Sequence, residues 1–104
     1  MPNSELIGIK GSGAYFPKQV VEVKELAHKH HLNYHTILED HGIKQIRVAN
    51  SQETELFMAT KAVEEALSDA KVKPGDIDVI IFCKGITRQK TARPIAIQII
   101  EEIK

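Results

Sequence analysis

Histidine and cysteine are the candidate metal-binding and nucleophilic side chains of this 104-residue chain. The five histidines cluster between positions 28 and 41, at His28, His30, His31, His35 and His41. His28, His31 and His35 would line one face of a continuous helix, beside Glu39, and such a face could hold zinc. A helix N-cap at Asn33 interrupts that helix, and no His-Glu-x-x-His motif is present. We therefore expect solvated histidines on surface helices, with a zinc site as the alternative.

Cys83 is the single cysteine, so the chain has no intrachain disulfide and a cytoplasmic location is predicted. Cys83 ends an apolar run, where a cysteine is more often a small buried hydrophobe than a nucleophile. We predict that it packs in the core.

Gly11 and Gly13 raise the question of a nucleotide-binding loop. The dinucleotide fingerprint needs a third glycine at position 16, where a helix begins, but Phe16 stands there and Pro17 follows. We reject this function. The basic run 84–93 carries four cations that could hold a phosphate, although most such loops are only solvated.

The longest predicted element is a helix between Ser51 and Lys71, with Ser51 as its N-cap. Its inward face is mostly alanine, which permits close packing against a neighbour. Pro74 ends the helix region and begins a turn through residue 76. Residues 77–83 form an unbroken apolar run that predicts a strand covered on both faces, as in a parallel sheet.

Shorter elements are predicted on either side of this region. They are a strand that begins at Leu6 and gives way to a loop by Gly13, a short helix within 20–31, a second from Asn33 through Leu38 ending near Gly42, a short exposed strand or extended arm over 43–49, and an apolar helix after Pro94. The order of elements predicts an α/β fold. Two good strands cannot cover the apolar faces of 77–82 and 95–103, so we expect a partner or a longer parent protein, and favour the latter.

The composition excludes several classes of function. Fourteen basic and fourteen acidic residues give a net charge of zero, which argues against a nucleic-acid partner. There is no long apolar run, so we predict neither a signal peptide nor a membrane span.

Several motifs together resemble one family. They are Ile9-x-Gly11-x-Gly13-x-Tyr15-x-Pro17 with Val20-Val21 and Glu25-Leu26, then Gly42-Ile43-x-x-x-Arg47, the alanine-rich helix from Ala59 to Ala70, Asp76-Ile77-Asp78-x-Ile80-Ile81, and Pro94-x-Ala96-x-x-Ile99. In this order they resemble the N-terminal part of the β-ketoacyl-acyl-carrier-protein synthase III family, over nearly all 104 residues.

The resemblance implies a thiolase-like layered α/β fold, of which residues 1–104 would be the front part of one βαβαβ half. It also implies condensation of an acyl-coenzyme A with malonyl-acyl-carrier protein, or related thioester chemistry, in a homodimer. Family members use a cysteine nucleophile with histidine and asparagine. All three would lie beyond this chain, so the resemblance assigns no catalytic, cofactor-binding or metal-binding residue and no cofactor to residues 1–104.

One departure concerns the acyl donor. The tryptophan and arginine with which the family contacts coenzyme A fall at Thr36 and Asp40, which would disfavour an adenine–phosphate ligand there. Two functions follow from the sequence: part of a condensing acyltransferase that lacks turnover by itself, or a short non-catalytic interaction module. Either predicts a chain that is not a monomer, because apolar surface is left uncovered.

Overall fold

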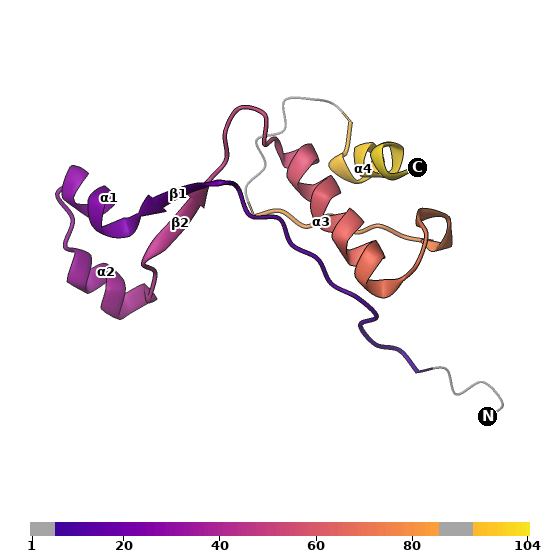
Figure 1. The fold of residues 1–104 in the computed structure, drawn as a ribbon, viewed down its shortest axis with the longest axis horizontal. Helices are drawn as coiled ribbons and strands as arrows, with labels where there is room; N and C mark the ends of the chain where they lie inside the picture. The colour runs from indigo at the N-terminus through magenta and orange to yellow at the C-terminus, as the bar shows by residue number, and fades with distance from the viewer. Residues whose placement is uncertain (1–5, 86–92) are drawn as a thin grey trace. The chain divides into compact units, whose positions relative to one another are not determined.

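The computed structural model describes residues 6–85 and 93–104, which fall into two compact units. One unit runs from Phe16 to Thr54, and the other combines the segment before residue 16 with residues from Glu55 onward. The elements are labelled in Figure 1. Each unit is described by itself.

The Phe16–Thr54 unit contains the sheet. Strand β1 (Gln19–Glu22) pairs antiparallel with β2 (Gln45–Val48), with Gln19 opposite Val48 and Glu22 opposite Gln45. The helices α1 (Val23–Lys29) and α2 (Tyr34–His41) lie between the strands in sequence (Figure 1). The small core of this unit includes Val23 and Ala27, both buried. The predicted strand over 43–49 is confirmed as β2, whereas β1 was not predicted.

Helix α2 begins and ends where the sequence predicted. The side chain of Asn33 accepts a hydrogen bond of 3.2 Å from the backbone N–H of Thr36, which satisfies one of the free donors of the first turn. Gly42 has a φ of +66°, and its N–H donates to the carbonyl of Leu38 at 2.8 Å. A left-handed residue of this kind favours glycine and closes the helix.

The second unit is built on α3 (Glu55–Ala70), which packs against α4 (Ile95–Ile103). Ile99 of α4 is 2% exposed and is the most deeply buried large side chain described. The turn predicted at Pro74 is the short 3-10 helix η1 (Pro74–Asp76). The predicted N-cap at Ser51 is wrong, because residues 51–53 form a turn and the helix starts at Glu55.

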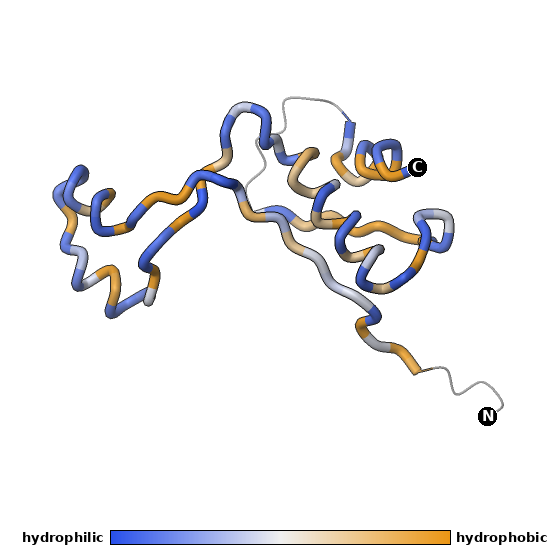
Figure 2. Tube along the Cα trace, in the orientation of Figure 1, coloured by the Kyte–Doolittle hydropathy of each residue, from blue (hydrophilic) through white to orange (hydrophobic). Residues whose placement is uncertain are grey.

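The two segments over 6–13 and 77–83 are extended, and neither predicted strand is paired within the described residues. Part of the apolar surface of 77–83 is uncovered there, as the sequence led us to expect. Val79 is 73% exposed and Ile81 is 82% exposed, while Ile80 and Phe82 are half-buried. Figure 2 shows the apolar colour of the extended trace that follows α3 and η1. Burial on two faces requires an apolar layer on each side, and within the described ranges the side of Val79 and Ile81 has none.

None of the helices in the described residues combines the length and apolar character needed to cross a membrane.

Candidate functional site

The extended segment around residues 11–13 packs against the alanine face of α3. A Cβ atom built on Gly11 would lie 2.7 Å from both the Cβ and the backbone nitrogen of Ala70. One residue later, the N–H of Ser12 donates to Oδ2 of Asp69 at 3.0 Å. Gly11 and Gly13 therefore allow the chain to lie against the helix backbone. Close packing against α3 explains both glycines without a nucleotide.

Aromatic and charged side chains meet at the first two turns of α3. The ring of Tyr15 meets Phe57 edge-on, with 5.5 Å between centroids and 88° between planes. The ammonium of Lys61 lies 5.7 Å from the centre of the Phe57 ring, within the range of a cation–π contact. Glu55 forms an ion pair with Lys84. These contacts are structural, and they contain no pairing of a nucleophile with a base.

Cys83 precedes Lys84 in sequence, and its side chain is exposed. The prediction that it packs in the core is therefore wrong. Its position follows the alternation of the 77–83 segment, in which residues 79, 81 and 83 are exposed. An activated thiol needs a neighbouring base or cation that favours the thiolate. Among the interactions of the described residues, none joins Cys83 to a histidine.

Two apolar grooves flank the start of the 77–83 segment. The larger, of about 550 Å³, lies between residues 74–80 and the end of α4, where Ile100 and Ile103 line it. The smaller, of about 360 Å³, lies between Lys10, Gly11 and α3, and Ile77 lines it too. Both are lined mainly by aliphatic side chains. They fit apolar groups and offer no arrangement for proton transfer.

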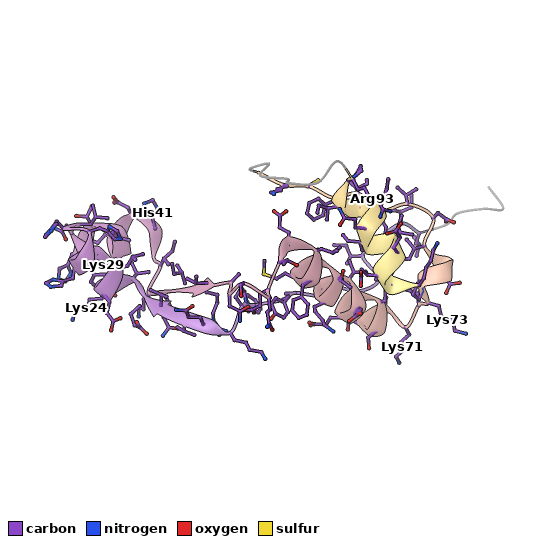
Figure 3. The ribbon with its side chains drawn as sticks, turned by 90° about the horizontal axis from the view of Figure 1, so that it is seen from above. Lys24, Lys29, His41, Lys71, Lys73 and Arg93 are labelled. Carbon is purple, nitrogen blue, oxygen red and sulfur yellow. The ribbon has the colours of Figure 1, made fainter. Side chains whose placement is uncertain are left out.

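The continuous histidine face that the zinc alternative requires does not form, because the helix is interrupted as predicted. His31 has a φ of +56° just after α1 ends, so α1 and α2 are separate helices, and His28 and His35 lie on different ones. No group of three metal-ligating side chains that could hold an ion occurs within the part of the chain that is described. Lys24, Lys29 and His41, labelled in Figure 3, are all exposed.

A buried carboxylate, that of Glu53, was missed as an organising residue. Its side chain is 6% exposed, and its two oxygens accept hydrogen bonds of 3.2 Å from the backbone N–H groups of Lys18 and Asn50. It joins the segment before β1 to the turn after β2. The helix predicted between Ser51 and Lys71 included Glu53, and the Asn50-x-x-Glu53 spacing was a local signal of a turn instead.

The basic run 84–93 lies mostly outside the described residues. Of its four cations, Lys84 and Arg93 are described, and each forms an ion pair, with Glu55 and Glu101 respectively. These two side chains therefore give no support to the alternative that the run holds a phosphate.

Thr36 and Asp40 are exposed on α2. The backbone N–H of Thr36 donates to Oδ1 of Asn33, the N-cap of α2. At positions 36 and 40 the chain has a hydroxyl and a carboxylate, whereas the family that it resembles has a tryptophan and an arginine.

The comparison with known proteins starts from sequence. No family model matches the chain. It is 37% identical over 75 residues to the β-ketoacyl-[acyl-carrier-protein] synthase III of Rickettsia akari, and 40% identical over 75 residues to that of Rickettsia felis. Both matches cover 72% of this chain and 24% of the relative. The chain thus spans about a quarter of the length of the curated relatives it matches.

Solved structures agree with the sequence matches. The priming β-ketosynthase of the R1128 polyketide biosynthetic pathway matches with a TM-score of 0.77 and 28% identity, covering 91% of this chain and 28% of the other. The 3-oxoacyl-[acyl-carrier-protein] synthase III of Aquifex aeolicus matches with a TM-score of 0.61 and 38% identity, covering 67% of this chain and 22% of the other. The resemblance predicted from the motifs is confirmed, and this chain is a relative of the β-ketoacyl-acyl-carrier-protein synthase III family.

Proposed function

We propose that residues 1–104 are the N-terminal portion of a thiolase-like domain in an acyltransferase of the β-ketoacyl-acyl-carrier-protein synthase III type. The whole protein would join an acyl thioester to a malonyl thioester with loss of carbon dioxide, in the synthesis of fatty acids or related acyl chains. The observation that carries this proposal is the match of 37% to 40% identity over 72% of the chain, together with the TM-score of 0.77.

The contribution of this chain would be structural. The cysteine, histidine and asparagine expected of the family would lie in the rest of the protein, and no interaction among the described residues pairs the exposed Cys83 with an activating histidine. What residues 1–104 supply is the alanine face of α3, the segment that Gly11 and Gly13 allow onto it, and the covering helix α4. The chain by itself would then be catalytically incomplete.

The acyl donor is proposed from α2. Thr36 and Asp40 place a hydroxyl and a negative charge at the expected coenzyme A contact, and both are exposed. A carboxylate repels the phosphates of coenzyme A, and a hydroxyl cannot stack on adenine. An acyl-carrier protein is therefore the preferred donor, with acyl-coenzyme A as the alternative. We further propose a cytoplasmic homodimer for the whole protein.

The experiment starts with the intact mass of the protein from its native source, detected with an antibody against this segment. A mass about three times the 11.6 kDa of this chain fits a two-half condensing enzyme. The purified whole protein should then consume malonyl-acyl-carrier protein in the presence of an acyl donor. The isolated chain should show no turnover. A whole protein with no cysteine-dependent condensation would reject the proposal.

A second candidate is a short, non-catalytic interaction module that reuses this part of the fold. It is favoured by the exposure of Val79 and Ile81 on an apolar segment that is unpaired within the described residues. A native mass of 11.6 kDa would support it. A longer native product with a nucleophilic cysteine after position 104 would eliminate it.

A further inference from the structure

The Phe16–Thr54 unit is closed by hydrogen bonds where the chain enters and leaves it. The carbonyl of Pro17 accepts a bond of 3.0 Å from Nη1 of Arg47, and the N–H of Lys18 donates to Oε2 of Glu53 at 3.2 Å. Both bonds join the first residues of the unit to residues near its end. The ladder between β1 and β2 begins directly after Lys18. The two bonds therefore lie at the end of the ladder that is nearest to both chain crossings.

Glu53 is also fixed within its own segment. The N–H groups of Gln52 and Glu53 both donate to Oδ1 of Asn50 at 2.9 Å, and the N–H of Asn50 donates to Oε1 of Glu53 at 3.2 Å. The reciprocal bonds between Asn50 and Glu53 have the pattern of a capping box. They hold a carboxylate that is 6% exposed, so its side chain loses little further freedom when Oε2 accepts from Lys18.

Backbone hydrogen bonds continue this closure into the helices. The N–H of Val23, the first residue of α1, donates to the carbonyl of Lys44 at 2.9 Å, and the N–H of Leu32 donates to that of Ala27 at 2.8 Å. All of these bonds join residues of the same unit, so they do not depend on what a longer protein packs against it. Contiguous segments held by their own bonds open together, often as one supersecondary motif.

We propose that the Phe16–Thr54 unit opens and closes as one cooperative element, separately from the unit built on α3, and that the carboxylate of Glu53 keeps it closed. The bond from Lys18 to Glu53 joins residues 35 positions apart, and the ladder follows from it. Loss of this bond should therefore release the whole unit rather than one turn. This inference goes beyond the proposed function, because it concerns the opening of one unit and no step of thioester chemistry.

The role requires a carboxylate, because two backbone donors approach its two oxygens. A glutamine has nearly the same shape but only one acceptor oxygen, and its NH₂ group would face the N–H of either Lys18 or Asn50. Glu53→Gln thus removes one closing bond with little change in volume. Glu39→Gln is the matched control, because it makes the same chemical change at an exposed position of the same unit.

Native-state hydrogen exchange of the 104-residue chain, read by NMR at low urea concentrations, tests the proposal. The reporting amides are those of Val23 and Leu32, which make no bond to Glu53 and so report opening of the unit at a distance. In Glu53→Gln both should exchange about fivefold faster than in the parent chain, the loss of one hydrogen bond. The amides of α3 should be unchanged, and Glu39→Gln should leave both units unchanged.

Gly13→Ala is the converse test, because its added Cβ meets the backbone of α3. Exchange at the amides of α3 should become faster, whereas Val23 and Leu32 should exchange as in the parent chain. Opposite responses to Glu53→Gln and Gly13→Ala would show two separately opening units.

Four results would overturn the proposal. Faster exchange confined to the amides of Lys18 and Asn50 in Glu53→Gln would make the carboxylate a local contact only. Equal acceleration in both units by either variant would show a single cooperative unit. Exchange unchanged by Glu53→Gln, or no protection of Val23 and Leu32 in the parent chain, would show that Glu53 does not keep the unit closed. The proposed function is tested by native mass and condensing activity, so the two can fail separately.

Discussion

The backbone N–H of Ser12 donates a hydrogen bond of 3.0 Å to Oδ2 of Asp69, a residue 57 positions later near the end of α3. The contact holds the segment before residue 16 along the helix. It is flanked by Gly11 and Gly13, where the chain lies too close to the helix backbone for a side chain. This arrangement leads to the first prediction.

Gly13→Ala should destabilise the unit built on α3. The added Cβ would meet the carbonyl oxygen of Ala62 and the backbone nitrogen of Ala66, neither of which can move without shifting the helix. Overpacking of this kind costs about 1–3 kcal/mol, measurable as a lower midpoint in urea denaturation followed by circular dichroism. Gly8→Ala is the matched control, since nothing lies within 4 Å of its Cβ position among the described residues. Equal effects of both substitutions would contradict the packing described.

Glu53→Ala should destabilise the Phe16–Thr54 unit by about 1–3 kcal/mol, because it leaves the backbone donors of Lys18 and Asn50 without this acceptor. Glu53→Gln keeps one acceptor oxygen and should lose less. Hydrogen exchange at those two amides, read by NMR, locates the effect. Unchanged exchange in Glu53→Ala would show that the carboxylate does not hold the two segments.

Asn33→Ala should shorten α2 and cost about 1 kcal/mol, since the N–H of Thr36 loses its acceptor. Asn33→Asp retains an acceptor and should remain near the parent in stability. The measurements are the helical signal of the chain and the protection of the Thr36 amide. A loss as large in Asn33→Asp as in Asn33→Ala would argue against the cap.

Ile99→Ala should be the costliest truncation in α4. Its side chain is 2% exposed, and removing it leaves a cavity between α4 and its neighbours, at about 2–5 kcal/mol. Ile97 lies two residues away on the same helix and is 47% exposed, so Ile97→Ala makes the same chemical change with less loss of burial. Comparable urea midpoints for the two variants would mean that α4 does not pack through Ile99.

Thr60→Val should stabilise α3. The Oγ1 of Thr60 is buried and has no hydrogen-bond partner among the described residues. Valine replaces this desolvated hydroxyl with a methyl group of similar shape, which should raise the free energy of unfolding by about 1 kcal/mol. Thr60→Ser keeps the hydroxyl and loses the methyl group, and should be less stable than the parent chain. Thermal unfolding of the three proteins decides the order, and a less stable Thr60→Val would show that the hydroxyl has a partner.

Features whose physical cause lies within a few residues could be predicted from the sequence. The Asn33 cap, the end of α2 at Gly42 and the turn at Pro74 each depend on local backbone geometry, and each was predicted correctly. The family resemblance could also be recognised from the sequence, because it depends on the order of motifs along the chain.

Burial and strand pairing depend on residues distant in sequence and could not be predicted from the local pattern. Residues 77–83 carry the composition of a buried strand, but a strand also requires a neighbour for its backbone and an apolar layer on each face. The described residues supply neither to Val79, Ile81 and Cys83, so these side chains are exposed. Glu53 shows the converse: its charge predicts a solvated position, and only the convergence of the Lys18 and Asn50 amides explains its burial.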